Sequence, residues 1–412
     1  MGSADSALLN KLESYADVAV KVGVNLQAGQ NLYIEADVEA ADFVRIVAKK
    51  AYEAGAHNVH FRYSDGELRR MRLMHSDEAA LVEVGKWNVE WYQSILDEDA
   101  ARLAIFTVNP SLLQNVHPER IAINSRATAE ALSFFNARIG DITWSGMGFP
   151  TETWASLLFP ELPETERLNR LWHLVLKITR ADQPDAVAAW KAHVEDLTFR
   201  ADYLNQKNYR KLHYRSTGTN LTIELHKKHR WISAGGKNSR GVPIVPNIPT
   251  EEVFTAPLQT GVNGVVRSTK PLNYNGATVD NFSLTFESGR IVDFEAEKGY
   301  EVLKSIIGMD EGSHFLGEVA LVPHDSPVSQ SNMVFLHTLY DENASCHLAI
   351  GRAYPMCVEG GTQMSADQLA EHGCNYSLAH VDFMIGSDEL DIDGITADGV
   401  IEPLFRNGKW AF

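Results

Sequence analysis

Along the first half of the chain, apolar residues recur with helical spacing in some segments and form short strand-like runs in others. Residues 5–22 show the helical spacing, and residues 30–35 then read as a short strand. The alternation continues with a helix at 39–54, strands at 58–63 and 102–108, and a helix at 127–137. This order is typical of a parallel sheet covered by helices, so an α/β domain is expected.

Residues 163–208 follow a helical pattern throughout, and beyond them the chain changes to short strands separated by turn residues. Two hairpins are predicted, pairing 211–216 with 220–225 and 281–286 with 290–294, and a helix is predicted at 300–307. We therefore expect two domains. Residues 1–200 form the α/β domain with mostly parallel sheet and a helical bridge, and residues 201–412 form an α+β domain rich in antiparallel strands.

The run at residues 380–386 reads as a strand with one buried face. Residues two apart on a strand project from the same face, so His380 and Asp382 should lie together. The residues between and after them, Val381, Phe383 and Ile385, should pack into a core. An imidazole and a carboxylate can both bind a metal ion, but one such pair cannot complete a site, so further ligands must come from other segments.

Other segments also place an acid or an imidazole among apolar residues. Residues 249–257 set Glu251 and Glu252 between prolines, and we expect one of these two carboxylates to point inward. Glu318 begins an otherwise apolar strand, where an unpaired charge would be costly to bury. His347 lies in a similar run. A single buried histidine is more often a core residue bonded to a carbonyl than a ligand, so the hypothesis depends on the whole set.

Three carboxylates and two imidazoles together carry a charge of minus three. Two divalent cations with a bridging hydroxide would balance it, which favours a two-ion site over a single ion. Oxygen and nitrogen ligands without thiolate suit Zn, Co or Mn. Two such ions can lower the pKa of a water and stabilise the oxyanion that forms when it attacks a carbonyl, so hydrolysis is the natural reaction class.

Composition and charge limit the possible partners and location. The chain has 412 residues, of which 44% are hydrophobic and 22% charged, enough for two globular domains. The net charge of -17 argues against nucleic acid and anionic membranes as partners, because proteins that bind them carry basic patches. No apolar run has the length of a membrane span, and the first residues lack a signal-peptide pattern, so a cytoplasmic location is expected.

Two further kinds of site are considered and rejected. Cys346, Cys357 and Cys374 are odd in number and lack the close spacing of a zinc knuckle, so buried free thiols are expected. No Gly-rich phosphate loop follows a predicted strand. The two glycines within residues 146–150 are not followed by a helix signal, so no nucleotide cofactor is expected.

The polar segments resemble the motifs of a known family. They are Pro-Thr-Glu-Glu-Val-Phe-Thr-Ala-Pro at 249–257, Glu318, Cys-His-Leu-Ala-Ile-Gly at 346–351, Tyr354-Pro355, and His-Val-Asp-Phe-Met-Ile-Gly at 380–386. In order and spacing they are similar to the thermophilic-aminopeptidase family of metallopeptidases, the aminopeptidase T and aminopeptidase S type. The resemblance covers essentially the whole chain, and no ligand position departs from the family pattern.

The resemblance implies a cytoplasmic, homodimeric metallo-aminopeptidase that uses two divalent ions to release N-terminal residues from peptides with a free N-terminus. The metal ligands that it implies are Glu252, Glu318, His347, His380 and Asp382. It selects Glu252 over Glu251, a choice that the residues alone leave open. It also places Tyr354 beside the metals, where the phenol could donate a hydrogen bond to the tetrahedral intermediate. The simpler alternative is that Tyr354 is a packing residue.

Two other functions stay open on the sequence. One is a different two-metal hydrolase, such as an amidase or a phosphatase, that uses the same ligands on another bond. The other is a non-catalytic peptide-binding module with a structural metal. Structural sites tend to be closed and four-coordinate, whereas five ligands spread over two ions leave positions open for water and substrate.

Overall fold

The computed structural model of the protein describes residues 6–233, 235–274 and 277–412. Residues 1–5, where the sequence shows no signal-peptide pattern, lie outside the described residues. The chain forms two compact units. The first runs to His193 and takes in Gly235–Pro249, and the second begins at Val194 and takes in Thr250–Phe412. The boundary expected from the sequence, near residue 200, did not include this return of residues 235–249 to the first unit.

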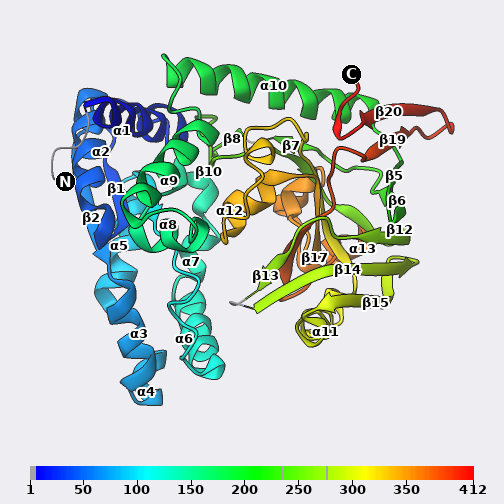
Figure 1. Ribbon diagram of the computed structural model, residues 1–412, viewed down its shortest axis with the longest axis horizontal. Helices are drawn as coiled ribbons and strands as arrows, with labels where there is room; N and C mark the ends of the chain where they lie inside the picture. The colour runs from blue at the N-terminus through cyan, green and yellow to red at the C-terminus, as the bar shows by residue number, and fades with distance from the viewer. Residues whose placement is uncertain (1–5, 234, 275–276) are drawn as a thin grey trace. The chain divides into compact units, whose positions relative to one another are not determined.

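The first unit contains a five-stranded sheet with the strand order β10-β4-β3-β1-β2, and all of its neighbouring strands are parallel (Figure 1). Its strands are β1 (Leu32–Asp37), β2 (Val59–Ser64), β3 (Ala101–Phe106), β4 (Trp144–Gly148) and β10 (Asn247–Ile248). Strand β10 belongs to the returning segment, after a small antiparallel pair of β8 (Gly236–Lys237) and β9 (Pro243–Ile244). The predicted parallel sheet is confirmed.

Helix α1 (Ser6–Val18) precedes the parallel strands, and further helices lie between them in the chain. These are α2 (Ala41–Glu53), α3 (Gly66–His75), α4 (Glu78–Val82), α5 (Lys86–Asp97), α6 (Pro118–Ala131), α7 (Ser133–Asn136), α8 (Glu152–Leu158) and α9 (Glu164–Ile178). Helix α10 (Ala186–Lys207) begins in the first unit and ends in the second. The helix predicted to start at residue 127 begins instead at Pro118, because proline has a helical φ and lacks the N–H that a first-turn residue leaves unpaired. None of the described helices has the length and apolar character needed to span a membrane.

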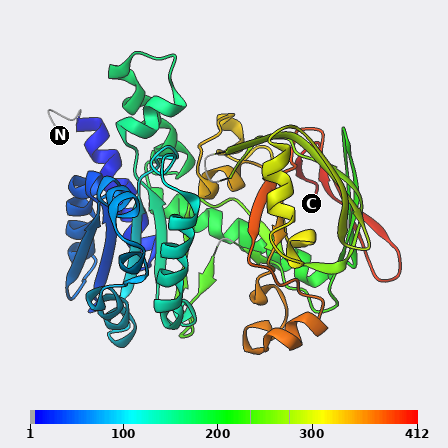
Figure 2. The same cartoon turned by 90° about the horizontal axis from the view of Figure 1, so that it is seen from below.

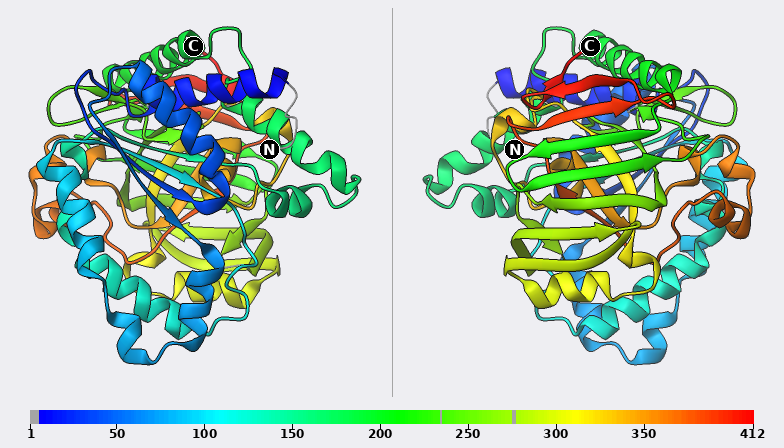
Figure 3. Two further views of the ribbon diagram at one scale, coloured as in Figure 1. Left: turned by 90° about the vertical axis from the view of Figure 1, so that its left-hand side faces the viewer. Right: turned by 90° about the vertical axis from the view of Figure 1, so that its right-hand side faces the viewer.

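The second unit is built on two antiparallel sheets. The larger has nine strands in the order β13-β14-β12-β6-β5-β19-β20-β21, with β15 paired to β14, and Figure 3 shows it face on. Its strands are β5 (Lys211–Ser216), β6 (Thr219–Leu225), β12 (Pro257–Arg267), β13 (Leu272–Tyr274), β14 (Ala277–Glu287), β15 (Arg290–Lys298), β19 (Asp391–Ile395), β20 (Ile401–Arg406) and β21 (Lys409–Trp410). The predicted hairpins β5–β6 and β14–β15 are confirmed.

The smaller sheet of this unit has the strand order β18-β17-β16-β11-β7. Its elements and the helices near them are β7 (Ile232–Ser233), β11 (Val253–Thr255), α11 (Tyr300–Ile307), β16 (Leu316–Leu321), α12 (Thr338–Asp341), β17 (His347–Gly351), α13 (Ala366–Glu371) and β18 (His380–Met384). Figure 2 shows the larger sheet curving around α11. One apolar core joins Ile223 of the larger sheet, Leu303 of α11 and Phe383 of the smaller sheet. The predicted α+β domain is confirmed.

The turn between β14 and β15 requires Gly289, so we expect Gly289→Ala to destabilise the second unit. Gly289 has a φ of +85°, and a Cβ at this position would collide with the carbonyl oxygen of Gln259. A positive φ alone costs an L residue about 1 kcal/mol. Because the backbone contact adds to that cost, the free energy of unfolding in urea should fall by about 2 kcal/mol or more.

Gly399→Ala is the matched control for this measurement. Gly399 has a φ of +86°, but no atom lies within 4 Å of the position that its Cβ would take. It should therefore show only the conformational cost of about 1 kcal/mol. An equal decrease in the free energy of unfolding in the two variants would show that the contact with Gln259 does not matter.

Candidate metal centre

One face of the smaller sheet carries the residues that the sequence predicts as metal ligands. The register pairs Glu318 with Ala349 and Ala349 with Asp382, so both carboxylates project from one face, on either side of a small side chain. His347 precedes Ala349 by two residues, and His380 precedes Asp382 by two, which places both imidazoles on the same face. Adjacent strands therefore bring four polar side chains together over one alanine.

The opposite face of these strands is apolar and belongs to the core. It contributes Val319 from β16, Leu348 and Ile350 from β17, and Val381 and Phe383 from β18, all of them buried. Ile385 follows in the same core. The prediction that Val381, Phe383 and Ile385 pack away from His380 and Asp382 is confirmed.

The polar side chains form two groups that share Glu318. His347 Nε2 lies 3.2 Å from Glu252 Oε2 and 3.5 Å from Glu318 Oε1. His380 Nε2 lies 3.4 Å from Glu318 Oε2 and 3.4 Å from Asp382 Oδ1. Each group could offer three ligand atoms to one metal ion. The structure thus brings all five predicted ligand residues together, and the two oxygens of Glu318 face different groups.

Backbone carbonyl groups orient both imidazoles. His347 Nδ1 donates to the oxygen of Ser345 at 3.1 Å, and His380 Nδ1 donates to the oxygen of Arg352 at 2.7 Å. A proton held on Nδ1 leaves the lone pair on Nε2, the atom that faces the carboxylates. Such a carbonyl partner is the usual arrangement behind a histidine that binds a metal.

A β-bulge at Gly317 brings the Arg352 carbonyl close to β16. The pairing of β16 with β17 shifts register between Leu316 and Glu318. A Cβ on Gly317 would collide with the carbonyl oxygen of Arg352, so only glycine allows this approach. Because the same oxygen accepts the His380 N–H, Gly317 contributes to the orientation of that imidazole.

Without metal ions, protonation of the two imidazoles stabilises the negative charges of the neighbouring carboxylates. Burial acts to raise the pKa of Glu318, but contacts with His347 and His380 outweigh burial and lower that pKa to about 2. Burial acts to lower the pKa of His380, yet Asp382 and Glu318 raise it to about 10. Burial also acts to lower the pKa of His347, but Glu252 and Glu318 raise it well above its usual value. The carboxylates therefore require positive charge, which divalent cations would also supply.

Glu252 provides a direct test of whether a metal ion fits. Its Oε2 atom is buried 3.2 Å from His347 Nε2, and no other described group donates a hydrogen bond to it. Burial raises the pKa of this carboxyl despite the neighbouring His347. When His347 is neutral, with its proton on Nδ1, this oxygen faces an imidazole lone pair, and metal coordination would satisfy both atoms. The oxygen and nitrogen donor set fits a divalent ion such as zinc, cobalt or manganese.

Tyr354 lies next to this site, just after β17. Its ring centroid is 4.7 Å from that of His380 and 6.2 Å from that of Phe254. Burial, followed by the negative charges of Glu318 and Asp382, raises the pKa of the phenol well above its usual value. Tyr354 therefore keeps its proton at neutral pH and can donate a hydrogen bond.

Two residues beside the site, the buried Asn343 and the half-buried Glu342, were not predicted from the sequence. Asn343 is fully buried, accepts a hydrogen bond from the Glu251 N–H at 2.7 Å and donates one to the Leu339 oxygen at 2.8 Å. It therefore fixes the backbone just before Glu252. Burial, with a further effect of Glu252, raises the pKa of Glu342 well above its usual value. Residues 341–343, Asp-Glu-Asn, have the composition of an exposed turn, so the sequence gives no sign that Asn343 is buried.

Asp341, the residue before Glu342, is held by two backbone groups. Its Oδ1 accepts from the Phe335 N–H at 2.6 Å, and its Oδ2 accepts from the His337 N–H at 3.0 Å. Burial outweighs these hydrogen bonds and raises the pKa of Asp341 from 3.8 to about 6. The ionised form of this carboxyl is therefore disfavoured in the folded protein.

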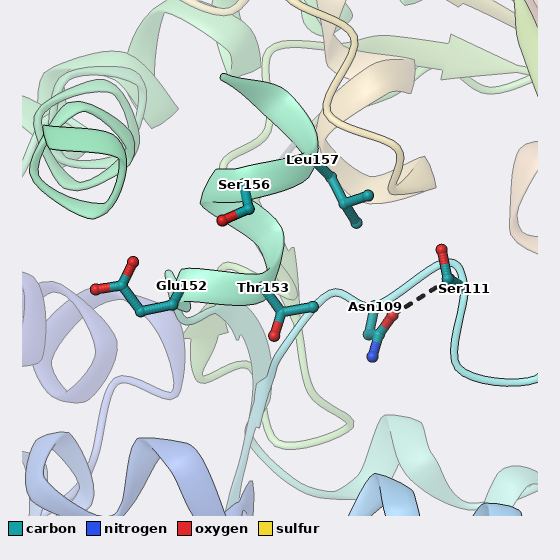
Figure 4. Close-up of a pocket in the computed structure, with 6 residues that line it drawn as sticks. All are labelled: Asn109, Ser111, Glu152, Thr153, Ser156 and Leu157. Atoms are coloured by element: carbon teal, nitrogen blue, oxygen red, sulfur yellow. Dashed lines mark hydrogen bonds between the residues drawn. The ribbon is translucent and has the colours of Figure 1, made fainter. Parts of the chain in front are cut away.

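Neither the three cysteines nor a hollow of the first unit provides a second set of metal ligands among the described residues. Cys346, Cys357 and Cys374 are free and buried, as predicted. Figure 4 shows an open hollow of the first unit that is lined by Asn109, Ser111, Glu152, Thr153, Ser156 and Leu157. One carboxylate among neutral side chains does not supply the ligand set found on the smaller sheet.

Comparisons with known proteins identify relatives over nearly the full length. The family model described as thermophilic metalloprotease (M29) matches residues 9–410. The chain is 48% identical over 404 residues to "Aminopeptidase 2" of Geobacillus stearothermophilus, covering 98% of each chain. It is 42% identical over 408 residues to "Aminopeptidase T" of Thermus aquaticus, covering 98% of this chain and 99% of that one.

A solved structure shares the fold. "Wild-type AmpT from Thermus thermophilus" matches with a TM-score of 0.92 and 40% identity, covering 98% of this chain and 100% of that one. The resemblance inferred from the sequence motifs is confirmed. Nothing in these relatives favours an amidase, a phosphatase or a module with a structural metal.

The raised pKa of Asp341 predicts a pH-dependent loss of stability. Since the folded pKa of about 6 exceeds the usual 3.8, the free energy of unfolding falls as pH rises between these values. Above pH 6, ionisation of Asp341 lowers the free energy of unfolding by up to about 3 kcal/mol. Asp341→Asn removes the titration. We expect wild type to lose that amount relative to the variant between pH 4 and pH 7, measured by urea denaturation of both proteins in chelator. A pH-independent difference would contradict the assignment.

Proposed function

Because this chain belongs to the thermophilic metalloprotease family (M29) and is a metal-dependent aminopeptidase, we propose that two divalent ions occupy the face of the smaller sheet. Five side chains would hold them: Glu252, Glu318, His347, His380 and Asp382. The position of Glu318 carries this proposal, since its two oxygens lie 3.5 Å and 3.4 Å from two different imidazoles. Glu318 would then serve both ions.

The remaining ligands divide between the two ions. Glu252 and His347 lie on one side of Glu318, and His380 and Asp382 lie on the other. When bound, zinc, cobalt or manganese would supply Lewis-acid activation of water and of the scissile carbonyl. The two Nδ1 hydrogen bonds to backbone carbonyls hold each imidazole with its Nε2 atom toward the carboxylates. This orientation is set by the chain itself.

We assign Tyr354 the role of a hydrogen-bond donor to the substrate. Its raised pKa keeps the phenolic proton in place, and its ring lies against His380 at 4.7 Å between centroids. A donor aimed at the oxygen that becomes negatively charged stabilises the transition state more than the bound substrate.

The proposed substrates are peptides with a free N-terminus. A neutral terminal amine has a lone pair, which could bind to one of the ions held by the three carboxylates. The amide nitrogen of a blocked terminus offers no such lone pair. We also propose that the protein acts as a homodimer in the cytoplasm, where its three buried free thiols would stay reduced.

The choice between the adjacent acids gives a direct test of the ligand set. Glu252→Gln should bind about one metal ion per chain instead of two and lose at least about 100-fold in kcat/KM, because the amide is a weaker ligand than a carboxylate. Metal content by mass spectrometry and peptide hydrolysis provide the measurements. Removal of all metal by a chelator should abolish wild-type activity, and zinc, cobalt or manganese should restore it.

Glu251→Gln is the matched control, since the side chain of Glu251 belongs to neither ligand group. This variant should keep two ions and lose no more than about tenfold in kcat/KM. Equal metal loss in both variants would contradict the assignment of Glu252.

A comparison of end-modified peptides tests the substrate class. We expect N-acetylation of a good substrate to lower kcat/KM by at least about 10³-fold, because the amide nitrogen that it creates has no free lone pair with which to bind an ion. Amidation of the C-terminus should have little effect, since the proposed site recognises the other end. Mass spectrometry should show stepwise loss of single N-terminal residues. Internal cleavage, or equal turnover of acetylated peptide, would contradict an aminopeptidase specificity.

A further inference from the structure

A second group of titratable side chains in the same unit is basic. Arg210 precedes β5, the sequence His-Lys-Lys-His-Arg at residues 226–230 follows β6, and His372 follows α13. The chain as a whole carries a net charge of -17, so positive charge is concentrated here against the overall balance. None of these residues belongs to the two groups that share Glu318.

Backbone and ring contacts bring these segments together. The Leu225 N–H donates to the Arg210 oxygen at 2.8 Å, so the start of the basic segment lies beside Arg210. The rings of His226 and His372 have centroids 5.3 Å apart. Burial lowers the pKa of His226, and the charges of His372 and Arg210 lower it further. His226 therefore lies within electrostatic range of both Arg210 and His372.

Two buried polar atoms of this cluster lack hydrogen-bond partners in the described part of the chain. The Nη1 atom of Arg210 is buried and makes no hydrogen bond there, and the same is true of His229 Nε2. Neither Arg210 nor the exposed Lys227 and Lys228 forms an ion pair with a described carboxylate. A buried guanidinium donor without an acceptor is costly, and a bound anion would remove that cost.

The hydrogen bonds of the two imidazoles indicate the kind of ligand. His226 Nδ1 accepts from the Lys228 N–H at 3.0 Å, so neutral His226 carries its proton on Nε2 and can donate it. His372 Nδ1 donates to the Gln368 oxygen at 2.9 Å, which leaves a lone pair on its Nε2. Arg210 and His226 thus offer donors, while neutral His372 offers an acceptor. Phosphate at neutral pH carries both acceptor oxygens and, in its protonated forms, a hydroxyl.

We propose that Arg210, His226 and His372 form a binding site for phosphate, either inorganic phosphate or a small phosphate monoester. Arg210 supplies the buried charge-assisted hydrogen bond, and Lys227 and Lys228 add attraction from the solvent side. A metal ion does not fit, because the positive side chains repel it and the Nε2 proton of His226 occupies the ligand position. A carboxylate ligand would leave the lone pair of His372 unused.

Titration calorimetry on the metal-loaded protein tests this site with inorganic phosphate as the probe. Arg210→Gln should weaken phosphate binding by at least about tenfold, the effect of losing one charge-assisted hydrogen bond. Arg290→Gln is the matched control, because Arg290 lies in the same unit but pairs with Glu311, and it should bind phosphate as wild type does. The Lys227→Gln/Lys228→Gln double variant alters only exposed side chains and should weaken binding a few-fold.

Two further comparisons separate this site from the metal centre and define its ligand. Inhibition of peptide hydrolysis by phosphate, which reports binding at the metals, should be the same in Arg210→Gln and in wild type. Methyl phosphate in place of inorganic phosphate shows whether a monoester also binds, and acetate should bind at least about tenfold more weakly. Wild-type phosphate affinity in both Arg210→Gln and the double lysine variant, or equal binding of acetate, would overturn the proposal.

Discussion

The candidate metal centre depends on one constraint, namely that successive residues of a strand must face opposite sides of the sheet. In β16, β17 and β18, one set of alternate residues is apolar and fills the core, which fixes the register of all three strands. The residues of the other set must then face the opposite side of the sheet. Glu318, His347 and Asp382 are brought to one face because Val319, Leu348 and Phe383 must be buried on the other. Burial of the core thus supplies the free energy that holds like-charged carboxylates close together.

The small residues of these strands determine whether that face can hold ions. Ala349 lies between Glu318 and Asp382 in the register, where a larger side chain would occupy the space between the two carboxylates. Gly317 allows the Arg352 carbonyl to approach β16, and that carbonyl orients His380. The charged residues therefore define the chemistry of the site, while an alanine and a glycine define its volume. Their apolar or absent side chains give no sign of this role in the sequence.

The sequence predicted those parts of the site that follow from strand periodicity. His380 and Asp382 could be placed on one face because they are two positions apart in a single strand, with Val381 between them. The same reasoning could not choose between Glu251 and Glu252, since both precede β11 and no alternation applies there. Glu342 and Asn343 were missed because only tertiary packing places this polar turn beside the site. The return of residues 235–249 to the first unit also gave no signal, because β10 pairs over only two residues with β4, too few to show a pattern.

The basic cluster and the metal centre are parts of one backbone arrangement in the second unit. The Arg230 N–H donates to the Cys357 oxygen at 2.7 Å, and the Glu359 N–H donates to the Lys228 oxygen at 2.9 Å. The segment that follows Tyr354 is thus paired with the segment that follows β6. Thr255, in β11 just after Glu252, donates its hydroxyl to the Arg230 oxygen at 2.9 Å. The loop of residues 226–230 is therefore hydrogen-bonded both to β11, which follows Glu252, and to the segment that follows Tyr354.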